Sequence, residues 1–197
     1  MEIIFATGNK NKVSEASDLL RPLGYEVKQM LLHGDAPVFE EPQSEDLVSI
    51  SISKASQARE LSMGTKLENS IILVEDSGLF IDSLKGFPGP FSSYAEKKIG
   101  IDGILKLLGP DKERGAEYRA VVMLDLGSEK IHFSGVCRGT LAKEKIGNSG
   151  FGFDPIFIPD DGDGRTFAQM EKEEKSQISH RGFALKALSE NLKNPSK

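Results

Sequence analysis

Apolar positions near the N-terminus predict a strand followed by a helix. Residues 2–6 read EIIFA, a short apolar run that ends in Thr7-Gly8-Asn9, as expected for a buried strand that opens into a glycine turn. Apolar residues then recur at helical spacing at Val13, Ala16, Leu19, Leu20 and Leu23. Gly24 follows as a stop signal for this helix.

The next elements are a second strand and a second helix. The strand is predicted around residues 25–31, and the acidic, proline-marked stretch 37–46 separates it from the helix. The stripe of the helix consists of Leu47, Ile50, Lys54, Ala58 and Leu61. Two interpretations of Lys54 are open: it snorkels from an apolar face, or it points toward a cleft.

The compact apolar run Ile71–Val74 predicts a third strand. It ends in Glu75-Asp76-Ser77-Gly78, which we expect to form a turn at the carboxyl end of the strand, where open α/β sheets bind ligands. Glycines and prolines at residues 86–90 then predict an irregular loop. A short helix is expected over Ile99–Leu108, ended by Gly109-Pro110.

The remaining pattern predicts a hairpin, a loop and a closing helix. Residues 117–125 and 130–141 are separated by Leu126-Gly127-Ser128-Glu129, which indicates a β-hairpin and therefore a mixed sheet. Gly147–Pro159 is a loop rich in glycine and aromatic residues. The last helix is expected over Glu171–Leu192, with a stripe of Ile178, Leu185, Leu188 and Leu192.

Composition restricts the class of protein. The 197 residues are 38% hydrophobic and 28% charged, with no internal repeat or linker, which indicates one globular domain over residues 1–197. A net charge of -5 argues against a nucleic-acid-binding surface. No apolar stretch approaches the roughly 20 residues of a membrane helix, and no targeting segment is expected. The single cysteine, Cys137, is expected to be a small buried thiol and points to a reducing cytoplasm.

Thr7–Lys12 is the first candidate for chemistry, because it lies between a predicted strand and a predicted helix. Exposed N–H groups, the positive end of the helix and a lysine can together bind a polyphosphate. The segment is not a P-loop, because the second glycine is absent, and a capped turn without a ligand is the alternative.

Carboxylates form the second candidate. Glu40 and Glu41 lie in a predicted loop, and Glu75 and Asp76 follow a predicted strand, so folding can bring two carboxylates onto one cation. Mg²⁺ prefers such oxygen ligands and shares them with substrate phosphates. Solvated surface acids are the alternative for Glu40 and Glu41.

Two segments near the C-terminus have the character of a base-binding site. Gly150–Pro155 offers close backbone approach, two aromatic rings that can stack on a purine, and Asp154 as an acceptor. Lys175–Gly182 brings hydrogen-bond donors to the last helix, and the consecutive His180 and Arg181 must face different sides of it. Taken alone, the first could be a turn with one phenylalanine in the core and the second a solvated charged turn.

In order and wording, these segments closely resemble the inosine triphosphate pyrophosphatase family, the non-standard purine NTP pyrophosphatases. The matching strings are FATGNKNK, EEPQ, VEDSGLFIDSLKGFPGPFSSY, GFGFDPIFIP and EEKSQISHRGFALKAL, and they span nearly the whole chain. The resemblance implies an elongated α/β fold with a mixed twisted sheet flanked by helices, in two lobes around a central substrate cleft. It also implies a homodimer.

The resemblance implies hydrolysis of ITP, dITP and XTP to a nucleoside monophosphate and pyrophosphate, which would cleanse the nucleotide pool. Its residue roles are as follows: Thr7, Gly8, Asn9, Lys10, Asn11 and Lys12 bind the triphosphate; Glu41 and Asp76 hold Mg²⁺; Asp76 is the general base and Lys54 a catalytic lysine; Ser77 contacts substrate; Phe151, Gly152, Phe153 and Asp154 form the base pocket; and Lys175, His180 and Arg181 complete recognition of the six-keto purine.

The residue types suit that chemistry. A carboxylate can deprotonate water, while a metal ion and lysines neutralise charge on phosphate. Hypoxanthine and xanthine carry a carbonyl at position six of the purine, where adenine carries an amine. Hydrogen-bond donors of the protein at that position therefore favour hypoxanthine and xanthine over adenine. This chain departs from the family pattern at two positions: Phe153 stands where the family often has a tyrosine, and Glu171 stands where it often has a Ser or Thr helix cap.

Two rival functions are open on the sequence. One is a related pyrophosphatase that acts on pyrimidine or modified nucleotides, against which the SHRG and GFGFDP segments argue. The other is a nucleotide-binding sensor without hydrolysis, which would lack a competent carboxylate, whereas Glu75-Asp76 is intact.

Overall fold

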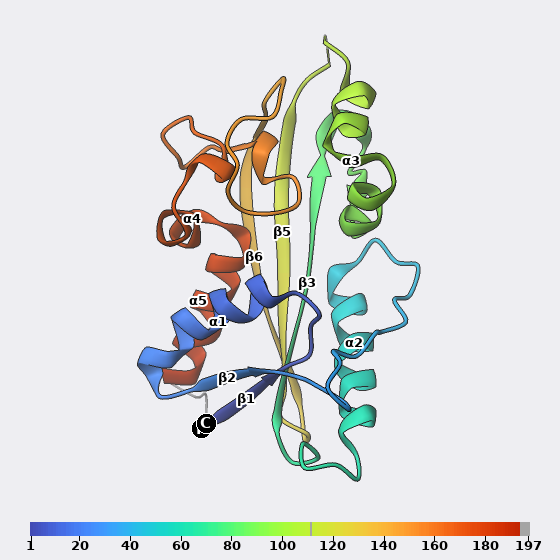
Figure 1. The fold of residues 1–197 in the computed structure, drawn as a ribbon, viewed down its shortest axis with the longest axis vertical. Helices are drawn as coiled ribbons and strands as arrows, with labels where there is room; N and C mark the ends of the chain where they lie inside the picture. Colours follow the sequence, from blue (N-terminus) through green and yellow to red (C-terminus); the bar gives the residue numbers. More distant parts are fainter. Residues whose placement is uncertain (111, 194–197) are drawn as a thin grey trace. The chain divides into compact units, whose positions relative to one another are not determined.

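A computed structural model describes residues 1–110 and 112–193 of the protein (Figure 1). The strands are β1 (Glu2–Phe5), β2 (Glu26–Gln29), β3 (Ile71–Ile81), β4 (Pro88–Gly89), β5 (Gly115–Asp125), β6 (Lys130–Leu141) and β7 (Phe157–Pro159). The α-helices are α1 (Lys10–Leu20), α2 (Leu47–Ser62), α3 (Ser92–Leu108), α4 (Lys172–Ile178) and α5 (His180–Lys193). Short 3₁₀ helices lie at Arg21–Leu23, Asp82–Leu84, Asp154–Ile156 and Phe167–Gln169.

The strands form a mixed sheet in the order β2-β1-β3-β5-β6-β7, and β4 pairs with β3. β1 pairs in parallel with β2 and β3, whereas β4 pairs antiparallel with β3 and β7 antiparallel with β6. The α/β class and the mixed sheet predicted from the sequence are therefore confirmed.

The chain divides into two compact units. Among the described residues, the first contains Met1–Asp76, Val121–Ser134 and residues 184–193, and the second contains Ser77–Ala120 and Gly135–Phe183. Strands β3, β5 and β6 each contribute residues to both units. The single domain over residues 1–197, the elongated shape and the central cleft stay predictions.

The first unit is built on the parallel pairing of β1 with its neighbours. Ile4 of β1, Ile72 and Val74 of β3, and Ala55 and Ala58 of α2 belong to one buried apolar cluster. The helix α2, drawn in cyan, therefore packs along this part of the sheet (Figure 1). Asp46 caps its N-terminus, because the carboxylate accepts hydrogen bonds from the N–H groups of Val48 and Ser49.

The first helix ends near the predicted stop. The α-helical part ends at Leu20, and the 3₁₀ turn Arg21–Leu23 continues to Gly24. Gly24 has a φ of 82°, the left-handed conformation that glycine adopts without strain, and its N–H donates to Arg21 O.

The second unit has its own apolar core. Its buried members come from β3, α3, β5, β6 and the segment 153–170, and they include Leu79, Ile104, Tyr118, Leu141, Phe153, Phe157 and Phe167. The predicted loop Gly147–Pro159 thus contains a 3₁₀ turn and the short strand β7, because Phe157 lies in this core.

The turn predicted at Glu75-Asp76-Ser77-Gly78 is wrong. Strand β3 continues through these residues to Ile81, and most of its residues are buried. A carbon added at the Cβ position of Gly78 would lie 2.1 Å from the carbonyl oxygen of Gly89. Gly78 therefore serves the close approach of β4 to β3 rather than a reversal of the chain.

Two predicted helices also have different bounds. Helix α3 begins at Ser92, before the predicted start at Ile99, and Gly100 interrupts it with a φ of 63°. The closing helix is two helices, because Ser179 between α4 and α5 has extended backbone with a ψ of 154°. Glu171 is the N-cap of α4, and its own N–H donates to Glu174 Oε2 at 2.9 Å.

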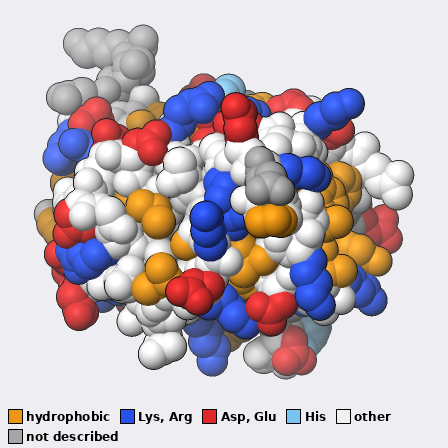
Figure 2. Space-filling model, turned by 90° about the horizontal axis from the view of Figure 1, so that it is seen from above, with side chains coloured by type: hydrophobic (Ala, Val, Ile, Leu, Met, Phe, Trp, Pro, Cys, Tyr) orange, Lys and Arg blue, Asp and Glu red, His pale blue; other side chains and the backbone are white. Residues whose placement is uncertain are grey.

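The buried position of Cys137 confirms the prediction that it is a small buried thiol. Acidic and basic side chains lie interspersed on the face that Figure 2 shows. Cys137 is buried, and this burial raises the pKa of its thiol to about 12. Within the described residues, none of the helices has the length and apolar character needed to cross a membrane.

Gly78→Ala is expected to lower the free energy of unfolding by about 3 kcal/mol, because the methyl group would overlap the backbone of Gly89 and force the two strands apart. Urea denaturation measures the change. Gly8→Ala is the control, since a Cβ at Gly8 would meet no atom within 4 Å. Equal stability of the two variants would contradict the close approach of β3 and β4.

The ion pair between Asp125 and Arg59 predicts that the stability of the protein depends on pH. The Asp125 side chain is 1% exposed, and its Oδ1 accepts hydrogen bonds from Arg59 Nη2 at 2.9 Å and from Gly127 N at 2.7 Å. Burial alone would raise the pKa of Asp125, but these bonds outweigh it and hold the pKa below its ordinary 3.8. The stabilisation is therefore present above that value and is lost as the pH falls through the lowered pKa.

Asp125→Asn is accordingly expected to unfold about 2 kcal/mol more easily at pH 7, with a smaller difference from the parent at pH 3. Urea denaturation at both pH values measures it. Asp163→Asn is the matched control, because Asp163 pairs with Arg165 on the surface, and it should change stability little. A difference that stays constant between pH 7 and pH 3 would contradict the role of the Asp125 charge.

Candidate functional site

The loop between β1 and α1 is held by its own side chains. Asn9 caps α1, because its Oδ1 accepts hydrogen bonds from the N–H groups of Asn11 at 2.9 Å and Lys12 at 3.4 Å. Thr7 Oγ1 in turn accepts a hydrogen bond from the N–H of Asn9 at 3.1 Å. Gly8 and Lys10 are exposed. The segment Thr7–Lys12 is therefore an ordered, accessible turn at a positive helix end, as the sequence predicted.

Lys12 is paired with Glu75 of strand β3. Its ammonium forms an ion pair with the Glu75 carboxylate, whose side chain is fully buried, and lies 3.4 Å from the Glu75 carbonyl oxygen. The sequence pattern suggested Glu75 as a candidate for a cation site and gave no sign that Lys12 is its partner. Because adjacent residues of a strand point to opposite faces, Glu75 and Asp76 form their ion pairs with different lysines.

Lys54 of α2 joins two of the predicted carboxylates. Its Nζ lies 2.6 Å from Asp76 Oδ1 and 2.6 Å from Glu41 Oε1. Lys54 and Asp76 are both buried, while the Glu41 side chain is half exposed. Of the two interpretations of Lys54, snorkelling into solvent is therefore wrong: the ammonium points to a buried carboxylate.

Burial and charge shift the pKa values of this group. Burial raises the pKa of Asp76, and it outweighs the lowering that Lys54 and Lys12 cause. Burial acts to lower the pKa of Lys54, but Asp76 and Glu41 overcome it, so that this pKa is raised. A carboxylate with a raised pKa is better matched to accepting a proton near neutral pH than an exposed aspartate is.

Glu41 and Asp76 are also the residues that could hold a metal ion. Asp76 Oδ2 is buried and accepts no hydrogen bond from the described residues. No cluster of three or more His, Cys, Asp or Glu side chains suited to a metal occurs in the described part of the chain. Mg²⁺ needs no such cluster, because it commonly takes one or two carboxylates and completes its shell with water and substrate phosphate.

The second unit contains a separate group around Asp154. The Asp154 carboxylate is buried and accepts hydrogen bonds from the Phe151 N–H at 2.9 Å and from Lys175 Nζ at 2.6 Å. Gly150 has a φ of 78°, and a Cβ there would lie 2.2 Å from Asp154 Oδ2. The turn can therefore close on the carboxylate only with glycine at this position.

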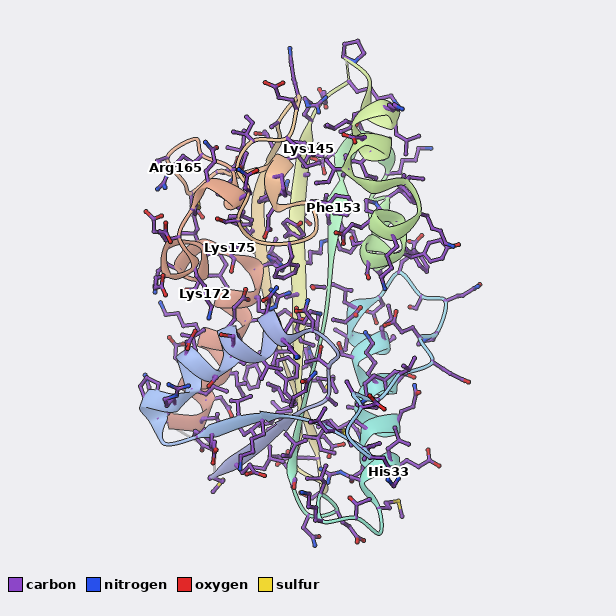
Figure 3. The ribbon with its side chains drawn as sticks, in the orientation of Figure 1. His33, Lys145, Phe153, Arg165, Lys172 and Lys175 are labelled. Carbon is purple, nitrogen blue, oxygen red and sulfur yellow. The ribbon has the colours of Figure 1, made fainter. Side chains whose placement is uncertain are left out.

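The two phenylalanines of this loop have different environments. Phe153 is 2% exposed and belongs to the core of the second unit, so its ring is not available as a stacking face. Phe151 is partly buried, and the cations of Lys175 and Arg181 lie 4.7 Å and 5.4 Å from its ring centre. Figure 3 labels Phe153 in the loop and Lys175 on α4.

His180 and Arg181 divide their contacts, as their consecutive positions predicted. The His180 ring stacks on Tyr118 of β5, with centres 4.5 Å apart and planes 8° from parallel. Arg181 Nη2 lies 3.4 Å from Ser77 Oγ. Tyr118 was missed in the sequence, where it is one aromatic residue in a strand pattern and carries no motif signal.

The structure thus gathers the predicted residues into two groups. The group in the first unit consists of Thr7, Gly8, Asn9, Lys10, Asn11, Lys12, Glu41, Lys54 and Asp76, with Glu75 added. The group in the second unit consists of Ser77, Phe151, Gly152, Phe153, Asp154, Lys175, His180 and Arg181, with Tyr118 added. Buried lysine–carboxylate pairs occur in both.

Comparison with known proteins gives consistent matches. The model of the Ham1 family matches residues 3–191. A dITP/XTP pyrophosphatase of Pyrococcus horikoshii is 43% identical over 193 residues, covering 98% of this chain and 97% of the relative. That of Methanopyrus kandleri is 45% identical over 195 residues, with the same coverage. The structure of the Staphylococcus aureus Ham1 protein matches with a TM-score of 0.83 at 32% identity, covering 100% of both chains.

Proposed function

The chain belongs to the Ham1 family, and on this basis we propose that it is a pyrophosphatase that hydrolyses non-standard purine nucleoside triphosphates. The substrates are ITP, dITP and XTP, and the products are the nucleoside monophosphate and pyrophosphate. Relatives that match nearly the whole chain are named dITP/XTP pyrophosphatases, which supports this substrate class.

One observation carries the proposal: Lys54 holds the carboxylates of Asp76 and Glu41 at 2.6 Å each. A buried carboxylate with a raised pKa, an adjacent ammonium and a second carboxylate are the groups needed to orient water and to neutralise phosphate charge. A sensor that binds nucleotide without hydrolysing it does not require a group that orients water.

Mg²⁺ fits this group as the cofactor. Asp76 Oδ2 accepts no hydrogen bond from the described residues, and both Asp76 and Glu41 supply the hard oxygen ligands that Mg²⁺ prefers. When bound, the ion would supply positive charge against the phosphate oxygens. Lys54 would then share the two carboxylates with the ion.

In the reaction, the oxygen of a water molecule forms a bond to the α-phosphorus, and the bond from that phosphorus to the bridging oxygen breaks to release pyrophosphate. Asp76 takes the proton of the water as general base. Lys54 stabilises charge on the phosphate, and Thr7–Lys12 binds the triphosphate through N–H groups and lysines.

The base is recognised by the residues of the second unit. Lys175, His180 and Arg181 provide donors toward a carbonyl at position six of the purine, where adenine carries an amine. Phe151 offers a stacking face, while Gly152 and Phe153 contribute main-chain atoms and Asp154 holds Lys175 in place. Ser77 contacts the substrate beside Arg181.

We further propose a cytoplasmic homodimer. The buried thiol of Cys137 accords with a reducing compartment. The homodimer follows from the resemblance of the motifs to the inosine triphosphate pyrophosphatase family, and sedimentation of the purified protein tests it.

A panel of ITP, XTP, dITP, GTP, ATP and dTTP with Mg²⁺ tests the function. We expect pyrophosphate release, with kcat/KM for ITP, dITP and XTP about 100-fold above that for ATP, because adenine opposes its amine to the donors. Pyrophosphate and orthophosphate are scored separately. Orthophosphate alone, or equal rates on ATP and ITP, would remove the proposed reaction or specificity, and preference for dTTP would favour the pyrimidine alternative.

Asp76→Asn is expected to lower kcat by at least about 100-fold, because the general base is lost, while nucleotide binding changes little. Steady-state kinetics and equilibrium binding of the nucleotide to the inactive variant measure the two effects.

Glu41→Gln is expected to raise the Mg²⁺ concentration needed for half-maximal rate. Glu40→Gln is its matched control, since Glu40 contacts Gln57 through its main chain and should behave as the parent.

A further inference from the structure

We propose that Tyr118 is a positioning residue for base recognition, which aligns both His180 and the loop Phe151–Asp154. This inference rests on the proposed function, because it assigns to Tyr118 the geometry of the base-binding residues. Tyr118 belongs to none of the sequence motifs, and its position becomes apparent only in the fold.

The ring of Tyr118 fixes the plane of His180. The two rings are nearly parallel, 8° apart, with centres at 4.5 Å, and both residues are almost fully buried. Behind the stack, Phe157 contacts Tyr118 edge-on at 4.8 Å. Because core aromatics hold the tyrosine, the imidazole that lies on it cannot tilt freely, and the directions of its ring nitrogens are set.

The hydroxyl end of Tyr118 supports the loop. The main-chain N–H of Phe153 and the charges of Asp154 and Arg181 all act on the Tyr118 hydroxyl. A Cβ placed on Gly152 would lie 4.0 Å from this oxygen. One side chain therefore contacts both segments that recognise the base, although they are distant in the sequence.

This arrangement has a kinetic consequence. The carboxylates and lysines assigned to phosphate chemistry belong to the first unit, whereas Tyr118 lies in the second unit, where it contacts His180 and core aromatic residues. Loss of its contacts should therefore raise KM and reduce the preference for dITP over ATP more than it lowers kcat. A merely structural role in the core would lower stability and leave the ratio of substrates unchanged.

The experiment compares Tyr118→Phe, which keeps the stack and removes the hydroxyl, with Tyr118→Leu, which removes both. Tyr94→Phe is the control, because Tyr94 is an exposed tyrosine of the same unit. For each full-length protein, kcat and KM are measured for dITP, XTP and ATP by pyrophosphate release. The imidazole resonances of His180 are recorded by NMR with labelled histidine.

Tyr118→Phe is expected to raise KM for dITP and XTP about fivefold, because the polar interaction of the hydroxyl with the Phe153 main chain is lost, with kcat within about twofold. Tyr118→Leu should reduce the preference for dITP over ATP at least tenfold and shift the His180 resonances, because the ring current of the stack is lost. Tyr94→Phe should match the parent in every measurement.

Folded Tyr118 variants with parental KM values and parental preference for dITP over ATP would overturn the positioning role. Should Tyr118→Leu fail to fold, Tyr118→Phe decides the question through its KM values. A parent protein that releases no pyrophosphate from any nucleotide overturns the proposed function itself. That outcome differs visibly from active variants with unchanged selectivity, which reject only the role of Tyr118.

Discussion

The ion pair between Lys54 and Asp76 places a charge of each sign in the interior of the first unit. Burying an isolated carboxylate or ammonium costs several kcal/mol or more, so neither group could occupy its position without the other. The pair joins α2 to β3, and Glu41 adds a second carboxylate from the loop before the helix. The same constraint applies to Lys12 and Glu75 on the other face of the strand.

The second unit solves the same problem with different elements. Lys175 of α4 contacts the buried carboxylate of Asp154, which also accepts the N–H of Phe151. The loop is thus closed around a charge, and its cation is brought over the ring of Phe151. In both units a lysine is oriented by a buried acid, so that its direction is set before any ligand is present, which is the preorganisation that phosphate and base recognition require.

The differences from the predicted elements have a common physical origin. Glu75 and Asp76 suggested the end of a strand because charged residues avoid the interior, but Lys12 and Lys54 come from other elements to neutralise them. Gly78 suggested a turn, yet it provides room for the backbone of Gly89. Ser179 divides the closing helix although its surrounding residues have helical periodicity. In each case the decisive partner is distant in sequence and leaves no local signal.

Local pattern by itself predicted the strands β1, β2, β5 and β6, the start of β3, the first two helices, the turn after β1 and the residue types available for phosphate and purine chemistry. These follow from periodicity, glycine and capping residues, which act over a few neighbouring positions. Tertiary structure alone decided that Lys54 contacts Asp76 and Glu41, that Phe153 belongs to the core while Phe151 meets two cations, and that Tyr118 supports His180. Burial and charge pairing depend on side chains brought together from separate elements, and the sequence does not encode these contacts locally.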